Sequence, residues 1–156
     1  MLKKVNTPAA KTLLDQNIDL ADRFRGTPFY IPLQIEFCGR LHPSSTFNFT
    51  GPDHIRGSFQ FTEGVPITKR GIHWLKIACA TAFDEGKAVS KQTFAQRLQW
   101  AEDHLSQICA AGKAPLEHLS WLSEAGDPIQ CIALFHELTK ALEAGPKLSL
   151  HRADWV

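Results

Sequence analysis

A glycine–arginine pair, Gly39-Arg40, follows directly on a segment in which apolar and polar residues alternate. Glycine lets the backbone approach another molecule closely, because it carries no Cβ. A guanidinium can hold a phosphate through two parallel hydrogen bonds. His42 and Arg56 would reach the same corner if the intervening loop folds back. These residues suit contact with a nucleic-acid backbone. The alternatives are an arginine paired with an acidic neighbour at a strand end, and ordinary exposed side chains at His42 and Arg56.

The overall charge limits how much nucleic acid the chain would hold by itself. Its 156 residues include 17 Lys plus Arg against 16 Asp plus Glu, which gives a formal net charge of +1. Phosphate neutralisation supplies most of the affinity of a free-standing nucleic-acid binder, so such proteins usually carry a basic excess. We therefore expect contacts with nucleic acid to be few and local, with binding weaker than the micromolar range at physiological salt.

Other familiar arrangements of reactive residues are missing from the sequence. It has no Cys-x-x-Cys pair, no HExxH zinc motif, no phosphate-binding loop and no Gly-x-Ser-x-Gly motif. No stretch approaches the roughly 20 apolar residues of a membrane span, so no membrane partner is expected. The N-terminal residues lack the apolar centre of a secretory signal. The cysteines, which we expect to be buried or half-buried thiols, are Cys38, Cys79, Cys109 and Cys131.

Two strands are predicted to position the Gly39-Arg40 corner. Period-two alternation predicts a strand over residues 28–40 that turns at Gly39, with its apolar face inward and Glu36 and Cys38 on the opposite face. After a loop over residues 42–54, a second short strand over residues 57–61 is expected to pair with the first. That pairing would bring Arg56 to the same end as Arg40, so that an exposed Arg40 shares one concave surface with Arg56.

The rest of the chain is predicted to be mainly helical. Thr68 is expected to cap a helix that ends near Phe83, and the stripe that starts at Phe94 predicts a helix ending at Gly112. Asp127-Pro128, an N-cap followed by a proline at the first helical position, opens a last helix. Further predicted features are a helix over residues 8–24, a short helix over residues 115–123, a terminal strand over residues 147–156, and core positions for Trp74, Trp100 and Trp121. Together these predict a single α+β domain over residues 1–156, mainly helical, with a small antiparallel β element near the N-terminal third.

An ordered series of segments resembles the single-subunit RNA polymerases of the bacteriophage and mitochondrial type. Residues 29–40, FYIPLQIEFCGR, are similar to the stretch that leads into that family's D/T-x-x-G-R motif. The segments that follow in the same order are EGVPI, KRGIHWLKI, FAQRLQWAEDH, APLEHLSW and EAGDPIQCIALFHE. The likeness covers residues 12–145. The sequence departs from the family pattern at Glu36, where Asp or Thr is usual, and at His42, where many members have Tyr.

The resemblance implies roles for several residues. Residues that would contact the template or the hybrid near an active site, with the aromatic ring stacking on a base, are Phe37, Gly39, Arg40, His42 and Arg56. Lys91, or alternatively Lys87, would lie near the nucleotide triphosphate, although a solvated lysine is the plainer interpretation. Asp154 would stand near the position of the first metal-binding aspartate, with the spacing off by one residue.

The resemblance also implies what a chain of this kind needs from elsewhere. Two aspartates hold the metal ions that bridge attacking and leaving oxygens in such polymerases, and the second aspartate and the nucleotide-binding helix are absent here. We therefore expect no polymerisation by this chain alone and no cofactor of its own, with Mg²⁺ in the complete polymerase. The implied partners are a second polymerase chain with the remaining catalytic motifs, DNA template and RNA, in the cytoplasm of a phage-infected bacterium or other host cell.

Three interpretations stay open. The first is a split polymerase subunit or a separately encoded piece of one, which would suit the Met1 start and an end near the first metal-binding motif. The second is a polymerase-derived module that binds or regulates without catalysis, and the third is a globular protein of unrelated function. A subunit should expose a large apolar patch within residues 125–156 for its missing half, whereas an independent module should have repacked it.

Overall fold

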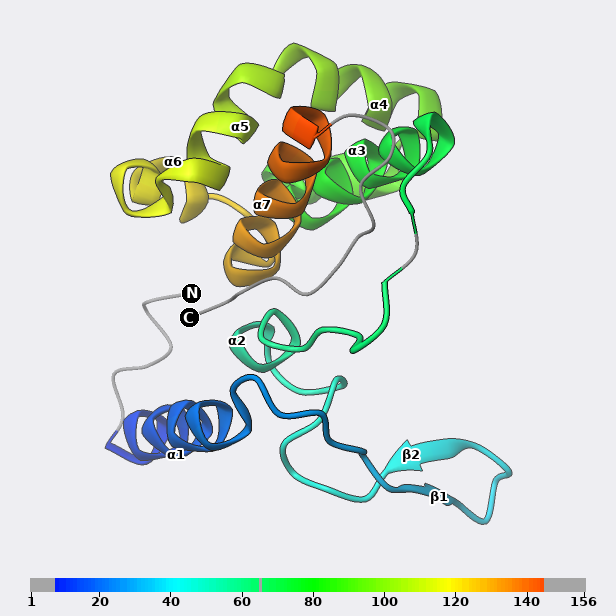
Figure 1. The fold of residues 1–156 in the computed structure, drawn as a ribbon, viewed down its shortest axis with the longest axis vertical. Coiled ribbons are helices and arrows are strands. Elements are labelled where there is room, and N and C mark those ends of the chain that lie inside the picture. Colours follow the sequence, from blue (N-terminus) through cyan, green and yellow to red (C-terminus); the bar gives the residue numbers. More distant parts are fainter. Residues whose placement is uncertain (1–7, 65, 145–156) are drawn as a thin grey trace. The chain divides into compact units, whose positions relative to one another are not determined.

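The computed structural model describes residues 8–64 and 66–144 (Figure 1). These residues form two compact units, which we call the N-terminal unit (residues 8–59) and the C-terminal unit (residues 60–144). Helices dominate, and one small antiparallel sheet lies near the N-terminal third, which confirms the predicted mainly helical α+β class. The single domain expected over residues 1–156 stays a prediction. The predicted terminal strand over residues 147–156 lies outside the described residues.

The N-terminal unit contains one long helix, a short hairpin and a single helical turn. Its elements are α1 (Pro8–Phe24), β1 (Leu33–Ile35), β2 (Leu41–Pro43) and α2 (Asp53–Arg56). The helix α1 has the predicted bounds. Four phenylalanines from different parts of this unit pack together, with ring centroids of neighbouring pairs 4.7 to 6.4 Å apart. They are Phe24, Phe29, Phe47 and Phe59. Beside them the buried Asn17 of α1 bonds to His54 of α2, with 3.2 Å between Nδ2 and Nε2.

The hairpin is tighter than predicted. The chain turns at Gly39 as expected, because its φ of +78° is readily open only to glycine and its amide donates to the Glu36 carbonyl at 2.8 Å. This turn makes the next residues, Leu41–Pro43, the partner of β1. The predicted second strand over residues 57–61 is therefore wrong, since the local hairpin has already taken the pairing. Residues 53–56 form α2, and residues 57–61 form no strand.

The C-terminal unit packs its helices around one core. Its helices are α3 (Lys69–Phe83), α4 (Phe94–Asp103), α5 (Leu105–Lys113), α6 (Leu119–Leu122) and α7 (Pro128–Ala144), with short 3-10 turns η2 (Glu85–Lys87), η3 (Val89–Lys91) and η4 (Pro115–His118). Figure 1 shows α7 running alongside α3 and α5. The largest fully buried side chains are Phe83, Phe135, Ile108, Leu122, Leu138, Cys79 and Cys131.

Helix ends follow the predicted signals, with one exception. The Thr68 hydroxyl accepts from the Gly71 amide and starts α3, and Pro128 is the first residue of α7. The helix predicted from Phe94 to Gly112 is instead two helices, because the chain bends at His104. The His104 ring stacks on Trp100, 4.4 Å between centroids, and its Nδ1 donates to the Trp100 carbonyl at 2.8 Å.

Two of the three helical tryptophans lie where expected. Trp100 and Trp121 are partly buried and pack on Phe83, with ring centroids 5.1 and 4.6 Å from it. The core position predicted for Trp74 is wrong, because this side chain is 44% exposed and meets Phe94 edge to face. Residue 74 lies beside, not on, the α3 stripe that faces the core.

The cysteines divide into one exposed and three inner thiols. Cys38 is exposed, contrary to expectation, because it lies in the hairpin turn; Cys109 is half-buried. Burial raises the pKa of Cys79 well above its usual range. We expect Cys38 to react with an aromatic disulfide reagent at once, and Cys79 and Cys131 only when the chain unfolds. Stopped-flow absorbance would check this, and a fast phase that persists in Cys38→Ser would contradict it.

Candidate nucleic-acid interface

The hairpin separates polar from apolar side chains. Residues opposite each other in an antiparallel pair share a face, and here Gln34 lies opposite His42 while Ile35 lies opposite Leu41. The hairpin's polar face consists of Gln34, Glu36, Arg40 and His42, and its apolar face of Leu33, Ile35, Leu41 and Pro43. Glu36 and Arg40 join the first set because the Glu36 amide donates to the Arg40 carbonyl at 2.9 Å, which continues the ladder by one step.

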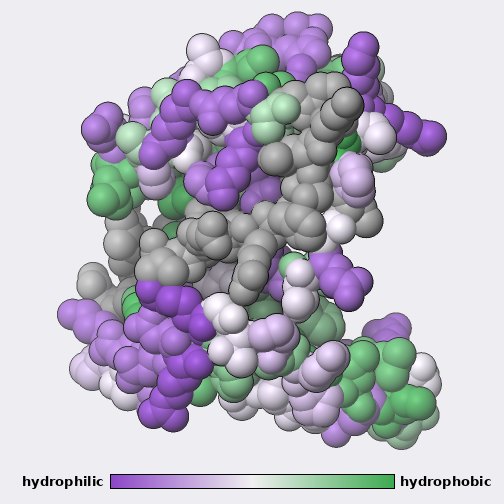
Figure 2. Space-filling model, viewed as in Figure 1, coloured by the Kyte–Doolittle hydropathy of each residue, from purple (hydrophilic) through white to green (hydrophobic). Residues whose placement is uncertain are grey.

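Both faces of the hairpin are open. The separation of faces follows the sequence prediction, but the apolar face was expected inward and is exposed instead. Figure 2 shows hydrophobic surface gathered over the hairpin tip. Phe37, the residue proposed to stack on a base, stands fully exposed beside the turn. Around Gly39 nothing lies within 4 Å of the position that a Cβ would take, so another molecule has free access to this backbone.

Arg40 is the exposed cation of the polar face. The neighbouring carboxylate is engaged elsewhere, because Glu36 Oε2 lies 3.4 Å from His42 Nε2 and accepts from Cys38 Sγ at 3.6 Å. The Arg40 guanidinium makes no hydrogen bond or ion pair with any described residue. A salt bridge at the strand end, the alternative interpretation of this arginine, is thus not formed within the part of the chain that the structure describes. The guanidinium keeps all its donors for another molecule.

Arg56 has a different setting from the one expected. It is half-buried at the end of α2, and the strand that was to bring it to the Arg40 corner does not exist. Its α2 turn packs inside the N-terminal unit, where Asp53 and Ile55 are buried. The strand pairing on which the shared concave surface of Arg40 and Arg56 was predicted is therefore absent, and that surface stays a prediction.

The lysine expected near a nucleotide sits in a well-anchored loop between α3 and α4. Asp84 has a positive φ of 45° and its Oδ1 accepts from the Ser90 amide at 2.7 Å. From the other side Arg97 of α4 donates to the carbonyls of Ser90 and Gln92. Lys91 stands exposed at the end of this loop. The side chain of Lys87 and the whole of Asp154 lie outside the described residues, and among those described no group of three or more His, Cys, Asp or Glu could hold a metal ion.

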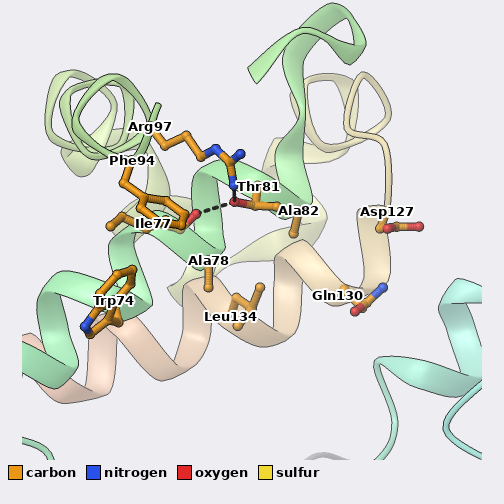
Figure 3. Close-up of a pocket in the computed structure, with 10 residues that line it drawn as sticks. All are labelled: Trp74, Ile77, Ala78, Thr81, Ala82, Phe94, Arg97, Asp127, Gln130 and Leu134. Atoms are coloured by element: carbon orange, nitrogen blue, oxygen red, sulfur yellow. Dashed lines mark hydrogen bonds between the residues drawn. The ribbon is translucent and has the colours of Figure 1, made fainter. Parts of the chain in front are cut away.

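An open groove in the C-terminal unit escaped the sequence analysis. It has a volume of about 410 Å³ and lies between α3, α4 and α7 (Figure 3). Trp74 and Phe94 line it as an edge-to-face pair with centroids 5.3 Å apart, and the Arg97 guanidinium lies 5.3 Å from the Phe94 centroid. Arg97 also donates to the Thr81 hydroxyl at 3.3 Å. No local spacing in the sequence joins residues on separate helices, so no signal pointed to this groove.

Comparison with known proteins gives a consistent result. Residues 65–151 match the family model described as DNA-dependent RNA polymerase. The chain is 32% identical over 129 residues to the mitochondrial DNA-directed RNA polymerase of Schizosaccharomyces pombe, covering 82% of this chain and 11% of the relative. It is 38% identical over 117 residues to the mitochondrial DNA-directed RNA polymerase 1 of Arabidopsis thaliana, covering 74% of this chain and 12% of the relative. Over 146 residues it is 36% identical to the chloroplastic/mitochondrial DNA-directed RNA polymerase 2 of Arabidopsis thaliana, covering 91% of this chain and 14% of the relative.

The coverage and the names of these relatives bear on the earlier expectations. The chain spans only 11 to 14% of their length. They are mitochondrial or chloroplastic enzymes, so they give no support to a bacteriophage origin or to the cytoplasm of a phage-infected cell. Among the described residues, no helix is long and apolar enough to cross a membrane.

Proposed function

This chain belongs to the DNA-dependent RNA polymerase family, and we propose that it serves transcription by contributing backbone contacts to the template strand or the RNA–DNA hybrid. The observation that carries the proposal is Arg40, an exposed guanidinium on the polar face of the hairpin with no partner among the described residues. A phosphate is the ligand that best matches its planar fork of donors.

Neighbouring groups support the same assignment. Gly39 leaves room for a strand to approach the turn, and Phe37 offers an exposed ring on which a base would stack. His42 lies on the same face as Arg40, and its partner Glu36 limits the positive charge of that face. Such a face would hold a few phosphates locally, in keeping with the net charge of +1.

The chemistry of RNA synthesis would come from elsewhere in the polymerase. Two-metal phosphoryl transfer needs carboxylates that hold both ions, and the described residues offer no such group. We propose that a second polymerase chain, or polymerase sequence beyond these residues, supplies the carboxylates together with Mg²⁺. Lys91 is a weaker proposal for contact with the nucleotide triphosphate, since it rests on its exposure and the anchored loop alone.

A polymerase-derived module that binds without catalysis is the second candidate. A subunit was expected to expose a large apolar patch within residues 125–156. Over residues 125–144, the large hydrophobic side chains that are exposed are Ile129 and Leu142, each 37%. The stretch that the structure describes therefore favours a repacked surface, which is the feature expected of an independent module.

Primer extension separates the two candidates. We expect the purified 156-residue chain to extend no RNA primer on a DNA template with any divalent metal, because its sequence lacks the second metal-binding aspartate of the family. A tagged copy isolated from its own cells should bring down template-dependent activity if it works inside a polymerase, and none if it is an independent module. Robust incorporation by the purified chain alone would overturn the proposal.

A further inference from the structure

A single arginine holds the backbone on both sides of Lys91. Arg97 of α4 donates from Nε to the Gln92 carbonyl at 3.0 Å and from Nη2 to the Ser90 carbonyl. Ser90 and Gln92 are the residues directly before and after Lys91 in the chain. The guanidinium therefore fixes the point at which the Lys91 side chain leaves the backbone.

The guanidinium is itself held in one orientation. Its third nitrogen, Nη1, donates to the Thr81 hydroxyl of α3 at 3.3 Å (Figure 3). That hydroxyl is fixed in turn, because it donates to the Ile77 carbonyl at 2.7 Å. Each of the three nitrogens of the planar, rigid group thus has a partner, in the loop or in α3. The loop is tied to both neighbouring helices through this one side chain.

Two further contacts set the direction of the loop. The Ser90 amide donates to Asp84 Oδ1 at 2.7 Å, so this residue is held through its amide as well as its carbonyl. Val89 points into the core and is only 3% exposed, whereas Lys91, two residues later, is exposed. The turn therefore directs one side chain inward and the lysine outward.

The charge of Lys91 is left without a partner among the described residues. Its ammonium group makes no hydrogen bond or ion pair with any of them. Both acidic side chains at the start of the loop have other donors: Asp84 accepts from the Ser90 amide, and Glu85 Oε2 accepts from the Trp100 indole at 2.8 Å. A cation held on a fixed backbone and left without a carboxylate suits an anionic ligand.

We propose that Arg97 is a positioning residue, which holds the loop so that the Lys91 ammonium meets the triphosphate of the incoming nucleotide. This inference rests on the nucleotide contact given to Lys91 in the proposed function. Arg97 would not touch the nucleotide, since each of its three nitrogens already has a partner within the chain. Its effect would come from geometry, because a displacement of about 1 Å is enough to weaken a reactive arrangement.

Arg97→Lys tests this role without changing the charge of the chain. A lysine keeps the cation but loses the planar fork, so it cannot hold both carbonyls and the hydroxyl at once. The polymerase isolated through the tagged full chain would add one nucleotide to a preformed RNA–DNA hybrid at a series of nucleotide concentrations. We expect Lys91→Ala to raise the half-saturating concentration about tenfold and Arg97→Lys about threefold, both with the maximal rate unchanged.

The double variant separates positioning from a merely structural role. Once Lys91→Ala has removed the lysine, Arg97→Lys should raise the half-saturating concentration by less than about twofold more, because the two effects act through one contact. Arg70→Lys is the matched control, since Arg70 is an exposed arginine in the first turn of α3, and it should change nothing. Far-UV circular dichroism would report whether each variant folds. If Arg97→Lys unfolds, Thr81→Val removes only the α3 partner and should give a smaller rise of the same kind.

The outcomes distinguish this inference from the proposed function. A folded Arg97→Lys with unchanged nucleotide dependence, or with an undiminished effect in the Lys91→Ala background, overturns the positioning role and leaves the nucleotide contact of Lys91 in place. An unchanged half-saturating concentration in Lys91→Ala removes that contact, and the role of Arg97 with it. If no template-dependent synthesis copurifies with the tagged chain, the proposed function in transcription fails, and this inference fails as well.

Discussion

Replacing Gly112 by alanine should lower the free energy of unfolding of the C-terminal unit by about 3 kcal/mol, at the upper end of the usual cost of overpacking a core. Gly112 is buried where α5 passes α7. A Cβ at this position would lie 2.6 Å from the Phe135 carbonyl oxygen and 2.6 Å from Thr139 Oγ1. These two atoms are also bonded to each other, because the Thr139 hydroxyl donates a hydrogen bond to the Phe135 carbonyl at 2.7 Å. The helices must therefore separate to admit the methyl group.

Denaturation in urea, followed by far-UV circular dichroism, would measure this change. Gly126→Ala is the matched control, since the nearest atom to its Cβ would be Asp84 Cβ at an ordinary 3.5 Å. The two variants add the same methyl group to the same unit. Equal midpoints for Gly112→Ala and Gly126→Ala would contradict a close contact between α5 and α7 at Gly112.

Helices were predictable from the sequence where local signals and packing agree. In α3 the Thr68 cap and the apolar stripe from Ile72 to Cys79 lie within a few turns of each other, so neighbouring residues fix both its start and its buried face. Pro128 marks the first turn of α7 in the same way. The bend at His104 was not predictable, because it depends on stacking with Trp100 and on a side-chain bond to its carbonyl.

The hairpin shows what alternation leaves undetermined. Period two assigns Ile35 and Glu36 to opposite faces, and the structure agrees. Alternation does not say which neighbour pairs with the strand, and the tight turn at Gly39 gives the pairing to Leu41–Pro43 in place of residues 57–61. Nor does it say whether the apolar face is covered by this chain or by another protein. Coverage depends on molecules that the sequence pattern does not contain.

Some features of the candidate site were predictable from the sequence, and others were not. The exposure of Arg40 followed from its place just after the turn. Its lack of an acidic partner did not, because that depends on Glu36 lying beside His42 across the hairpin. Trp74 and Phe94 come from two different helices and meet in the groove. Helical periodicity relates only residues of the same helix, so it could not predict this contact.

Arg40→Ala should reduce RNA synthesis by the polymerase isolated through this chain roughly 10- to 100-fold at physiological salt. The estimate assumes the loss of a charge-assisted hydrogen bond worth about 1.5–3 kcal/mol, and each 1.36 kcal/mol of activation free energy changes the rate about tenfold. Arg40→Lys keeps the charge but loses the planar fork, so we expect an intermediate loss. Single-turnover extension of a preformed RNA–DNA hybrid would measure the rate.

Arg23→Ala provides the control for charge alone. Arg23 is also an exposed arginine of the N-terminal unit, in the last turn of α1. Removing either cation changes the net charge of the chain by the same amount, so a general electrostatic effect would slow both variants equally. Only a specific phosphate contact at the hairpin makes Arg40→Ala the slower enzyme, and the difference from the unsubstituted chain should shrink as added salt weakens that contact. Equal rates for the two variants would remove the argument for Arg40 as the residue that grips the nucleic acid.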